Sequence, residues 1–448
     1  MRFCLDDSTL KDLDIFSEKR SAVSLYSIFN RTRTLGGRNR LIEVMEKPSA
    51  DIEFLIERRD SIKWFYEQNI SLDVTNNQLD LIEHYLNYNK RLLRDNFADA
   101  IFDKLLSKIQ NSVNYYTIEV GIKNILKLLR SAEILATKIK QEKSSRHLKR
   151  RCSAVDKLLN IPLIREVLAK KTLSSFNTNK LDRLFRKQKL TTVKELIDFI
   201  YELDVFECAA EVVRSKKWSF PEYNNTPVLE VNISGLFHPA INNAVENDLS
   251  INGKSIIFLT GPNTAGKSSL LKATGLAIYL AHIGFPVKAS KMTTSVFNGL
   301  ITTINLPDDI HNAQSHYYSE VRRLKETALA ILDKGRLFII FDELFRGANP
   351  KDAYEASLQI INSLNKINNC VFIISTHIVE LATELKALKN VAFKYLESSF
   401  HEGKPVFTFK LKEGVSYERL GMFILKNEGV IDALQQAACK YEVTNVND

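Results

Sequence analysis

The chain has 448 residues, of which 45% are hydrophobic and 26% are charged, and its formal net charge is +9 at pH 7. This composition is typical of a folded protein with more than one domain, and it excludes a disordered, collagen-like or low-complexity chain. The positive charge favours an anionic partner such as nucleic acid, although a basic surface that only keeps the protein soluble would have the same charge.

Apolar residues recur every three or four positions through the first half, for example over 105–140. Leu, Ile and Val return on one face while Lys, Glu and Gln fill the other, which predicts long amphipathic helices. Pro48 and Pro162 mark turns between these helices. We therefore predict an all-α domain over residues 1–225.

The pattern changes after a connector rich in Pro and Asn at 218–227. Short β-rich runs then alternate with helical stretches, as in a mainly parallel sheet that is covered on both faces. The predicted strands are 228–233, 255–260, 336–341, 370–375 and 405–411. We therefore predict an α/β domain over residues 226–448, which makes the chain multidomain.

The cysteines are widely spaced and include no CxxC pair, which predicts reduced, buried thiols and neither disulfides nor a zinc site. They are Cys4, Cys152, Cys208, Cys370 and Cys439. The N-terminus lacks the apolar region of a signal peptide, and no apolar run is long enough to span a bilayer. We expect a cytoplasmic protein with no membrane partner.

The strand at 255–260 runs directly into GPNTAGKSS, and a helical stretch follows. This is the Gly-x-x-x-x-Gly-Lys-Ser pattern of a phosphate-binding loop, or Walker A motif, in its strand–loop–helix context. Its glycines let the backbone wrap around phosphates, Lys267 supplies a positive charge, and Ser268 offers a hydroxyl to Mg²⁺. The alternative is a tight turn with a chance lysine. The predicted nucleotide contacts are Gly261, Pro262, Asn263, Thr264, Ala265, Gly266, Lys267, Ser268 and Ser269.

Two further strands end in polar residues that suit phosphoryl transfer. Asp342 and Glu343 follow the apolar run at 336–341, where Asp342 suits Mg²⁺ and Glu343 suits a general base for the attacking water. His377 follows the strand at 370–375 and could sense the γ-phosphate or the water. A solvated strand end and a surface histidine are the alternatives.

These motifs and their surroundings resemble the ATPase domain of the MutS mismatch-repair proteins. The segments GPNTAGKSS, AQSHYYSEV, FDELFRGAN, STHIVEL and EGVSYERLGMFIL occur in that order. Upstream, 24–62 looks like the start of the MutS core and lever region, and 204–213 looks like its end. The resemblance implies an ABC-like ATPase that binds ATP and Mg²⁺, the metal being held by Ser268 and Asp342.

The resemblance also implies that ATP is bound between the two subunits of a homodimer. Ser315 of one subunit would then reach the γ-phosphate held by the other, and Glu320 matches the acidic residue that follows. Asn263 would position the γ-phosphate or water, so that Glu343, His377 and Asn263 form the implied catalytic set.

The sequence also departs from the family pattern. The core region begins almost at residue 1, so we expect no mismatch-reading or connector domain, and the lever region is short. The position at which MutS proteins stack a phenylalanine on adenine aligns with Ala244, which puts base selectivity in doubt.

A DNA-binding surface could lie in the basic segment 138–151, which has seven Lys or Arg against one Glu. Arg183, Arg186, Lys187 and Lys189 form a second basic segment. Such clusters neutralise phosphates without reading sequence, but they are also typical of a solvated helix face. We expect an ATP-gated DNA-binding dimer that acts in mismatch repair. The alternatives are a binder of branched or duplex DNA in recombination and a nucleotide-dependent dimerisation switch with negligible turnover.

Overall fold

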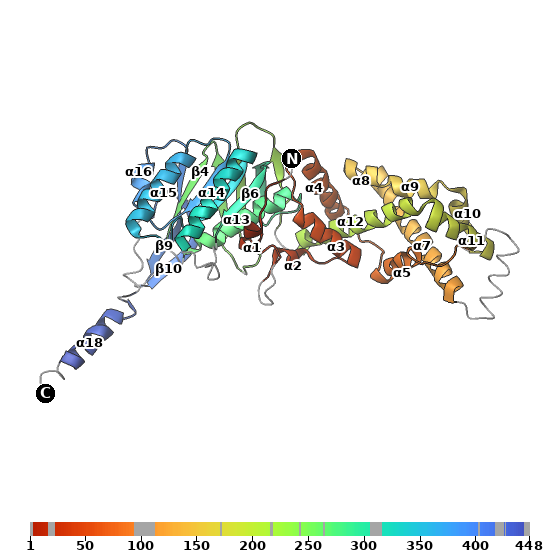
Figure 1. Ribbon diagram of the computed structural model, residues 1–448, viewed down its shortest axis with the longest axis horizontal. Helices are drawn as coiled ribbons and strands as arrows, with labels where there is room; N and C mark the ends of the chain where they lie inside the picture. Colours follow the sequence, from red (N-terminus) through yellow and green to blue (C-terminus); the bar gives the residue numbers. More distant parts are fainter. Residues whose placement is uncertain are drawn as a thin grey trace.

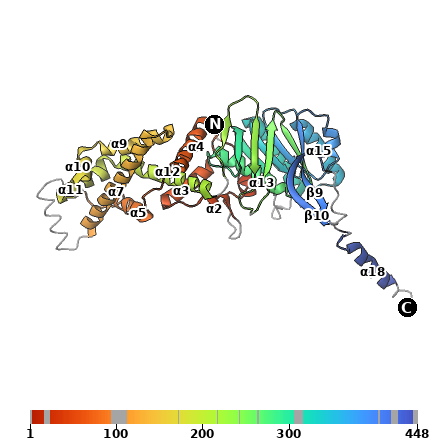
Figure 2. The ribbon, with the colours of Figure 1, turned by 180° about the vertical axis from the view of Figure 1, so that it is seen from behind.

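The computed structural model of the chain is elongated, with a helical half at one end and an α/β half at the other (Figures 1 and 2). This arrangement confirms the predicted combination of helical and α/β parts. The residues that it describes are 3–16, 23–93, 113–170, 173–215, 218–241, 243–262, 265–304, 316–401, 404–416, 425 and 427–442.

The helical half is built from short and long helices. Its elements are α2 (Leu25–Phe29), α3 (Leu35–Glu46), α4 (Ile52–Glu67), α5 (Asn76–Leu86), α7 (Val113–Gln141), α8 (Arg146–Arg151), α9 (Ser153–Leu159), α10 (Pro162–Lys170), α11 (Ser175–Arg183), the π-helix η1 (Leu184–Gln188) and α12 (Leu190–Ser215). Pro48 lies between α3 and α4 and Pro162 begins α10, as predicted. The predicted helix at 105–140 is present as α7, and its first part, 105–112, lies outside the described residues.

The helix α12 is the central axis of this half and packs against α3, α4 and α9. Most of its residues are buried, including the carboxylates of Glu202, Asp204 and Glu207. Asp204 accepts hydrogen bonds from the backbone N–H groups of Arg33 and Thr34, both at 3.0 Å. Because a buried charge is costly unless it is paired, these carboxylates fix how the surrounding helices sit on α12.

The main sheet of the α/β half has six strands in the order β10-β9-β4-β8-β7-β6. They are β4 (Ile256–Thr260), β6 (Gly299–Thr303), β7 (Leu337–Asp342), β8 (Val371–Ser375), β9 (Val391–His401) and β10 (Lys404–Glu413). Only β9 and β10 pair antiparallel in this sheet, and its other neighbouring strands are parallel. The prediction of a mainly parallel sheet is therefore confirmed for these six strands.

A second sheet of four strands, in the order β1-β5-β2-β3, is mixed and was not predicted. Its strands are β1 (Glu222–Asn224), β2 (Glu230–Leu236), β3 (Asn247–Asn252) and β5 (Lys291–Ser295). The predicted strand at 228–233 belongs here as part of β2, and not to the main sheet. The strand β3 alternates buried and exposed residues, and its sequence NDLSIN contains too few apolar residues to stand out as a strand.

Side chains of the main sheet alternate between two hydrophobic cores because successive strand residues point to opposite faces. Ile257 and Ile340 belong to the core that includes α13 (Lys267–His282), and Ile256 and Ile339 belong to the other. The second core packs against α15 (Pro350–Leu364) and α16 (Leu381–Leu385), and side chains of α14 (His316–Lys334) contact it. The helix α13 also meets β3 of the second sheet, so it lies between the two sheets.

The N-terminal segment 3–16, which contains α1 (Asp7–Asp12), packs on the edge strand β6. Cys4 forms a parallel bridge with Gly299, and Asp6 forms a two-contact ion pair with Arg323 of α14. This segment therefore contacts the α/β half, although the sequence reading places it in the helical domain. The division of the chain at 225/226 stays a prediction.

The end of α13 contacts the helical half directly. The Tyr279 hydroxyl donates a hydrogen bond to the carbonyl oxygen of Met45, and the backbone N–H of Ser49 donates to the carbonyl oxygen of His282 at 2.7 Å. Arg58 of α4 donates to the carbonyl oxygen of Ile283 at 3.0 Å, where a cation suits the C-terminal end of a helix. A single helix thus connects the loop before Lys267 with α3 and α4.

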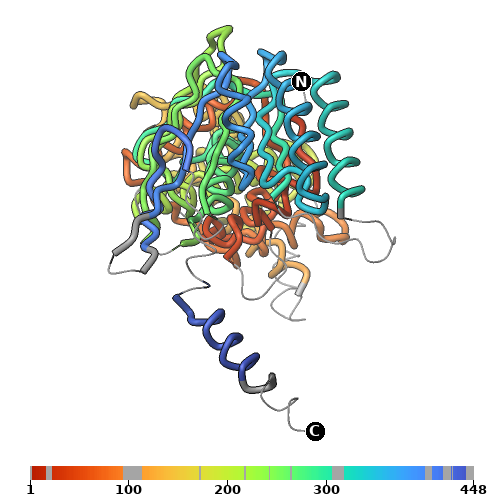
Figure 3. Tube along the Cα trace, turned by 90° about the vertical axis from the view of Figure 1, so that its left-hand side faces the viewer, coloured from red at the N-terminus to blue at the C-terminus, as the bar shows by residue number. Residues whose placement is uncertain are grey.

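The helix α18 (Val430–Glu442) projects away from the rest of the molecule (Figures 1 and 3). It carries Cys439, which is exposed and so differs from the predicted buried thiols, whereas Cys152, Cys208 and Cys370 are buried. All five cysteines are free thiols, as predicted. Among the residues that the structure describes, no helix combines the length and apolar character needed to cross a membrane.

Candidate active site

The three strands that carry the predicted motifs lie side by side in the main sheet. The strand β8 pairs with β4 on one side and with β7 on the other, and all three run parallel. Leu259 and Asp342 are both register partners of Ser375, so the carboxyl ends of these strands meet at one edge of the sheet. This edge is where ligands bind in open α/β sheets.

The loop between β4 and α13 is bounded by two glycines with positive φ, Gly261 at 139° and Gly266 at 92°. These conformations favour glycine, because a Cβ atom would be strained there. A Cβ built on Gly261 would lie 3.4 Å from the carbonyl oxygen of Leu396. Ala265, between them, is fully buried. Asn263 and Thr264 lie outside the described residues.

Lys267 is the first residue of α13 and its side chain is 3% exposed. Its ammonium group donates to the carbonyl oxygens of Gly261 and Pro262 at 2.7 and 3.2 Å. It also lies 3.9 Å from the Glu343 carboxylate. Burial lowers the pKa of Lys267, while the carboxylates of Glu343 and Asp342 oppose that shift. The loop thus holds a buried cation at a helix N-terminus, where anionic oxygens are favoured.

Ser268 and Asp342 meet next to this cation. The Ser268 hydroxyl donates to one carboxylate oxygen of Asp342 at 2.5 Å, and the Ser375 hydroxyl donates to the other. A hydroxyl and a carboxylate are hard oxygen ligands that suit Mg²⁺, which usually takes few protein ligands beside substrate phosphates. The described residues include no cluster of three or more His, Cys, Asp or Glu side chains that could hold a metal on its own. The oxygen pair therefore fits a magnesium ion that is bound together with a phosphate ligand.

Glu343 has the left-handed conformation, with φ at 58°. Its backbone N–H donates to the carbonyl oxygen of Ser375 at 3.1 Å, which fixes the turn after β7. Its carboxylate lies 3.9 Å from His377 Nδ1 and 3.8 Å from Arg346 Nε. Strained backbone held by neighbouring strands is typical of functional sites, and here it places a mostly buried carboxylate beside Lys267 and His377.

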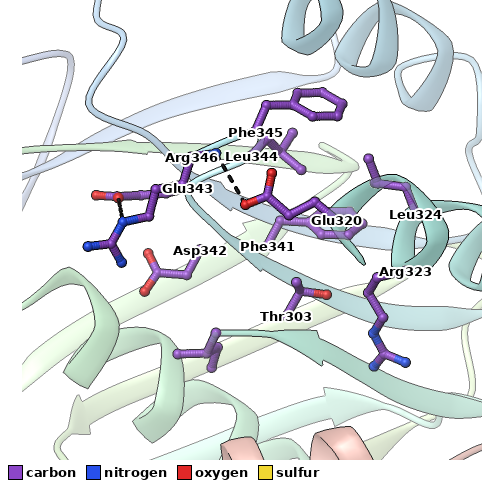
Figure 4. Close-up of a pocket in the computed structure, with 11 residues that line it drawn as sticks. Thr303, Glu320, Arg323, Leu324, Phe341, Asp342, Glu343, Leu344, Phe345 and Arg346 are labelled. Carbon is purple, nitrogen blue, oxygen red and sulfur yellow. Dashed lines mark hydrogen bonds and ion pairs between the residues drawn. The ribbon is translucent and has the colours of Figure 1, made fainter. Parts of the chain in front are cut away.

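A cavity of about 130 Å³ adjoins the end of β7. Figure 4 shows Asp342 and Glu343 beside it, with Glu320 extending from α14 towards the backbone of Arg346. Arg323, also on α14, lines the cavity, and its guanidinium is paired with Asp6. Glu320 is buried and accepts a hydrogen bond from the backbone N–H of Arg346 at 3.2 Å. Arg346 could not be singled out from the sequence, because the chain turn that brings it to Glu343 and Glu320 has no local signature.

A second cavity, of about 280 Å³, lies on the other side of the loop. It is mostly apolar and is lined by Ala244, Gly266, Ser269 and Phe409, among others. Phe409 lies at a bulge in β10, its φ is 56°, and its ring is 3.2 Å from a Cβ built on Gly266. Sequence reasoning missed this aromatic residue, because it lies far along the chain from the loop.

Asn247 shapes this second cavity by joining β3 to β10. Its side-chain amide donates to the carbonyl oxygen of Phe409 at 2.9 Å, and its side-chain oxygen accepts from the backbone N–H of Leu411 at 2.7 Å. A flat ring such as a nucleobase could fit between Phe409 and the residues around Ala244, close to the phosphate-binding loop.

The structure thus brings most of the predicted site residues together. Gly261, Lys267, Ser268, Asp342 and Glu343 converge at one sheet edge. His377 is near them, but its side chain is 56% exposed. Ser315, like Asn263 and Thr264, lies outside the described residues.

The fold and the site define a multidomain protein in which a helical half adjoins an α/β half with a phosphate-loop-like turn. The chain belongs to the MutS family. The family model described as MutS domain III matches residues 8–334, and that described as MutS domain V matches residues 257–444.

Individual MutS proteins resemble this chain over about half of its length. One is a DNA mismatch repair protein MutS from Bacillus pumilus (strain SAFR-032), which is 31% identical over 243 residues, covering 52% of this chain and 27% of the relative. The proteins of the same name from Petrotoga mobilis and Bacillus subtilis (strain 168) are 29% and 27% identical, covering 54% and 53% of this chain. The matched regions are 30% and 28% of these two relatives, so the chain spans less than a third of the curated relatives it matches.

Proposed function

We propose that this protein binds ATP with Mg²⁺ and hydrolyses it to ADP and phosphate. The observation that carries the proposal is the convergence of a buried lysine, a hydroxyl–carboxylate pair and a second carboxylate at the ends of three adjacent strands. Lys267, Ser268, Asp342 and Glu343 supply these groups. Phosphoryl transfer needs positive charge, a metal-binding oxygen pair and a group that orients water, and this set provides all three.

The residues would share the work as follows. Lys267 exchanges its loop carbonyl contacts for phosphate oxygens, and Ser268 and Asp342 hold the magnesium ion, which supplies positive charge beside the phosphates. Glu343 accepts the proton of the attacking water, and His377 and Asn263 contact the γ-phosphate or that water. The adenine base occupies the cavity beside Phe409 and Ser269.

The family resemblance supports a homodimer in which Ser315 of the second subunit completes the γ-phosphate site. Closure of such a dimer would move α13. This movement would reach the helical half directly, because the end of α13 contacts Met45, Ser49 and Arg58. ATP binding would in this way control whether the helical half binds DNA. We place this cycle in the cytoplasm.

The names of the relatives, DNA mismatch repair protein MutS, favour a role in DNA mismatch repair. Binding of branched or duplex DNA in recombination, without mismatch preference, is the second candidate. A dimerisation switch with negligible turnover is the third. ATP turnover measured with and without DNA separates the third from the others, and titrations with matched, mismatched and branched DNA separate the first two.

The substitution Glu343→Gln tests the ATPase assignment. It keeps the size of the side chain but removes the base, so ATP should remain bound while hydrolysis slows by at least about a hundredfold. Glu384→Gln, on the exposed side of α16, is the matched control and should leave turnover unchanged. If Glu343→Gln hydrolyses ATP as fast as the wild type, another residue is the general base. If the wild-type protein neither binds nor hydrolyses ATP, the proposed activity is wrong.

A further inference from the structure

The N-terminal segment 3–16 covers one edge of the main sheet. Among the described residues the strand β6 ends the strand order, so its outer side is open to other segments. The carbonyl oxygen of Cys4 accepts a hydrogen bond from the backbone N–H of Leu300 at 2.9 Å. Further along the same edge, the buried Asp12 carboxylate accepts from the backbone N–H of Ile304 at 2.9 Å. The segment is therefore an integral part of the α/β half.

The same segment holds the helix α14 through Arg323. This side chain is 8% exposed, and its two terminal nitrogens donate to the two carboxylate oxygens of Asp6 at 2.7 and 3.1 Å. One of these nitrogens also donates to the carbonyl oxygen of Thr302, in β6, at 2.9 Å. An arginine and a carboxylate that make two contacts fix direction as well as distance. Arg323 therefore fixes α14 to both the N-terminal segment and the edge strand.

Glu320, three positions before Arg323, connects α14 with the turn after β7. Residues three apart are neighbours on a helix surface, and both side chains line the cavity beside the end of β7. The Glu320 carboxylate accepts from the backbone N–H of Arg346 at 3.2 Å, and Arg346 Nε lies 3.8 Å from the Glu343 carboxylate (Figure 4). A chain of contacts therefore runs from Asp6 to the carboxylate proposed as the general base.

Glu343 depends on such support because its own backbone is strained. Its φ of 58° is a conformation that residues other than glycine rarely adopt, so surrounding contacts must hold it. The phosphate-binding groups Lys267 and Ser268 belong to α13 instead. A shift of α14 should therefore displace the base more than it displaces these groups. Misplacement by about 1 Å can slow a reaction about a hundredfold.

We propose that Asp6 and Arg323 are positioning residues for ATP hydrolysis. Their ion pair holds α14 in place, and Glu320 on this helix then holds the turn that carries Glu343. In this role neither member of the pair contacts the nucleotide, so the pair contributes to the rate of hydrolysis and not to ATP binding. The role rests on the ATPase function proposed above, with Glu343 as the general base.

The test breaks the ion pair from each side with substitutions that keep a side chain of similar size. Asp6→Asn removes the negative charge, and Arg323→Lys keeps a positive charge but loses the two-contact geometry. Asp7→Asn and Arg322→Lys, at the adjacent exposed positions, are the matched controls. The turnover number kcat, the KM for ATP and the thermal unfolding midpoint are measured on the full chain with saturating Mg²⁺. Turnover is measured below the midpoint of every variant.

Each substitution in the pair should lower kcat about tenfold and leave KM within about twofold of the wild-type value. The double variant Asp6→Asn/Arg323→Lys should be no slower than the slower single variant, because both substitutions break the same contact. Both controls should turn over ATP as fast as the wild type.

An ion pair that only stabilises the fold would give variants with a lower unfolding midpoint and an unchanged kcat, and this result would overturn the proposal. Losses of kcat that multiply in the double variant would overturn it too, as would a raised KM with unchanged kcat. A wild-type protein without ATPase activity would overturn the proposed function together with this role, which makes the two failures distinguishable.

Discussion

The hydroxyl of Ser268 and the carboxylate of Asp342 lie 2.5 Å apart, although 74 positions separate them in the chain. Ser268 is the second residue of α13, the helix after β4, and Asp342 ends β7. The strand between β4 and β7, β8, contributes Ser375 to the same carboxylate. The strand order therefore builds the oxygen pair, because the parallel strands β4, β8 and β7 present their carboxyl ends at one edge of the sheet.

Replacing Asp342 with Asn should raise the Mg²⁺ concentration needed for half-maximal ATP binding or turnover, by about tenfold or more. The amide keeps the shape of the side chain but loses the negative charge that holds the ion. A magnesium titration of nucleotide binding measures the effect. Asp333→Asn, at the exposed end of α14, is the control. An unchanged magnesium requirement in Asp342→Asn would assign the ion to other residues.

Replacing Phe409 with Ala should weaken ATP binding about tenfold, because stacking of a base on an aromatic ring contributes about 1–3 kcal/mol. Affinity for inorganic triphosphate, which has no base, should not change. Val406→Ala, at an exposed position on the same strand, is the matched control. If both ligands weaken equally in Phe409→Ala, the cavity beside the loop does not hold the base and only supports the loop.

The site residues on the three motif strands could be predicted from the sequence, because each motif follows directly on an apolar strand. The strands themselves were predicted at 255–260, 336–341 and 370–375, within one or two residues of β4, β7 and β8. The local signal was sufficient there, since a buried parallel strand reads as a continuous apolar run.

Other features depend on contacts between distant segments and have no local signal. Phe409 reaches the phosphate-loop region from β10 through a bulge, and Asn247 comes from a strand too polar to be recognised. The basic residues showed the opposite problem. Their charge was evident in the sequence, but only the structure shows that Arg151 and Arg186 are committed to carboxylates.

Replacing Arg186 with Ala should destabilise the helical half by about 3–5 kcal/mol, because Asp182 would be left buried without its cation. Chemical denaturation followed by helical circular dichroism measures the change. Lys187→Ala, one position along the same π-helix, should change stability by less than about 0.5 kcal/mol. Similar stability of the two variants would show that water or another cation compensates the Asp182 charge.

His282 makes folding stability depend on pH. Its ring is fully buried at the end of α13, with Nδ1 donating to the carbonyl oxygen of Ile278 at 2.7 Å and Nε2 accepting from the backbone N–H of Phe297 at 2.9 Å. Both contacts are satisfied by the neutral ring. Burial lowers the pKa of His282 from its usual 6.5 to about 4, and the hydrogen bond to Ile278 opposes that shift.

Because the pKa of His282 is depressed in the folded state, the unfolded chain binds the proton first as the pH falls. The stabilisation is therefore complete above pH 6.5 and is lost between pH 6.5 and about 4. From neutral pH to about pH 5 the loss in the free energy of unfolding should be about 2 kcal/mol.

Urea denaturation of the wild type and of His282→Gln at the two pH values isolates this contribution from that of the carboxylates. The variant should be less stable at neutral pH, but its stability should fall by about 2 kcal/mol less on acidification. His84→Gln, at an exposed position on α5, should behave as the wild type. An identical pH dependence in wild type and His282→Gln would show that this ring takes up its proton equally in the folded and unfolded states.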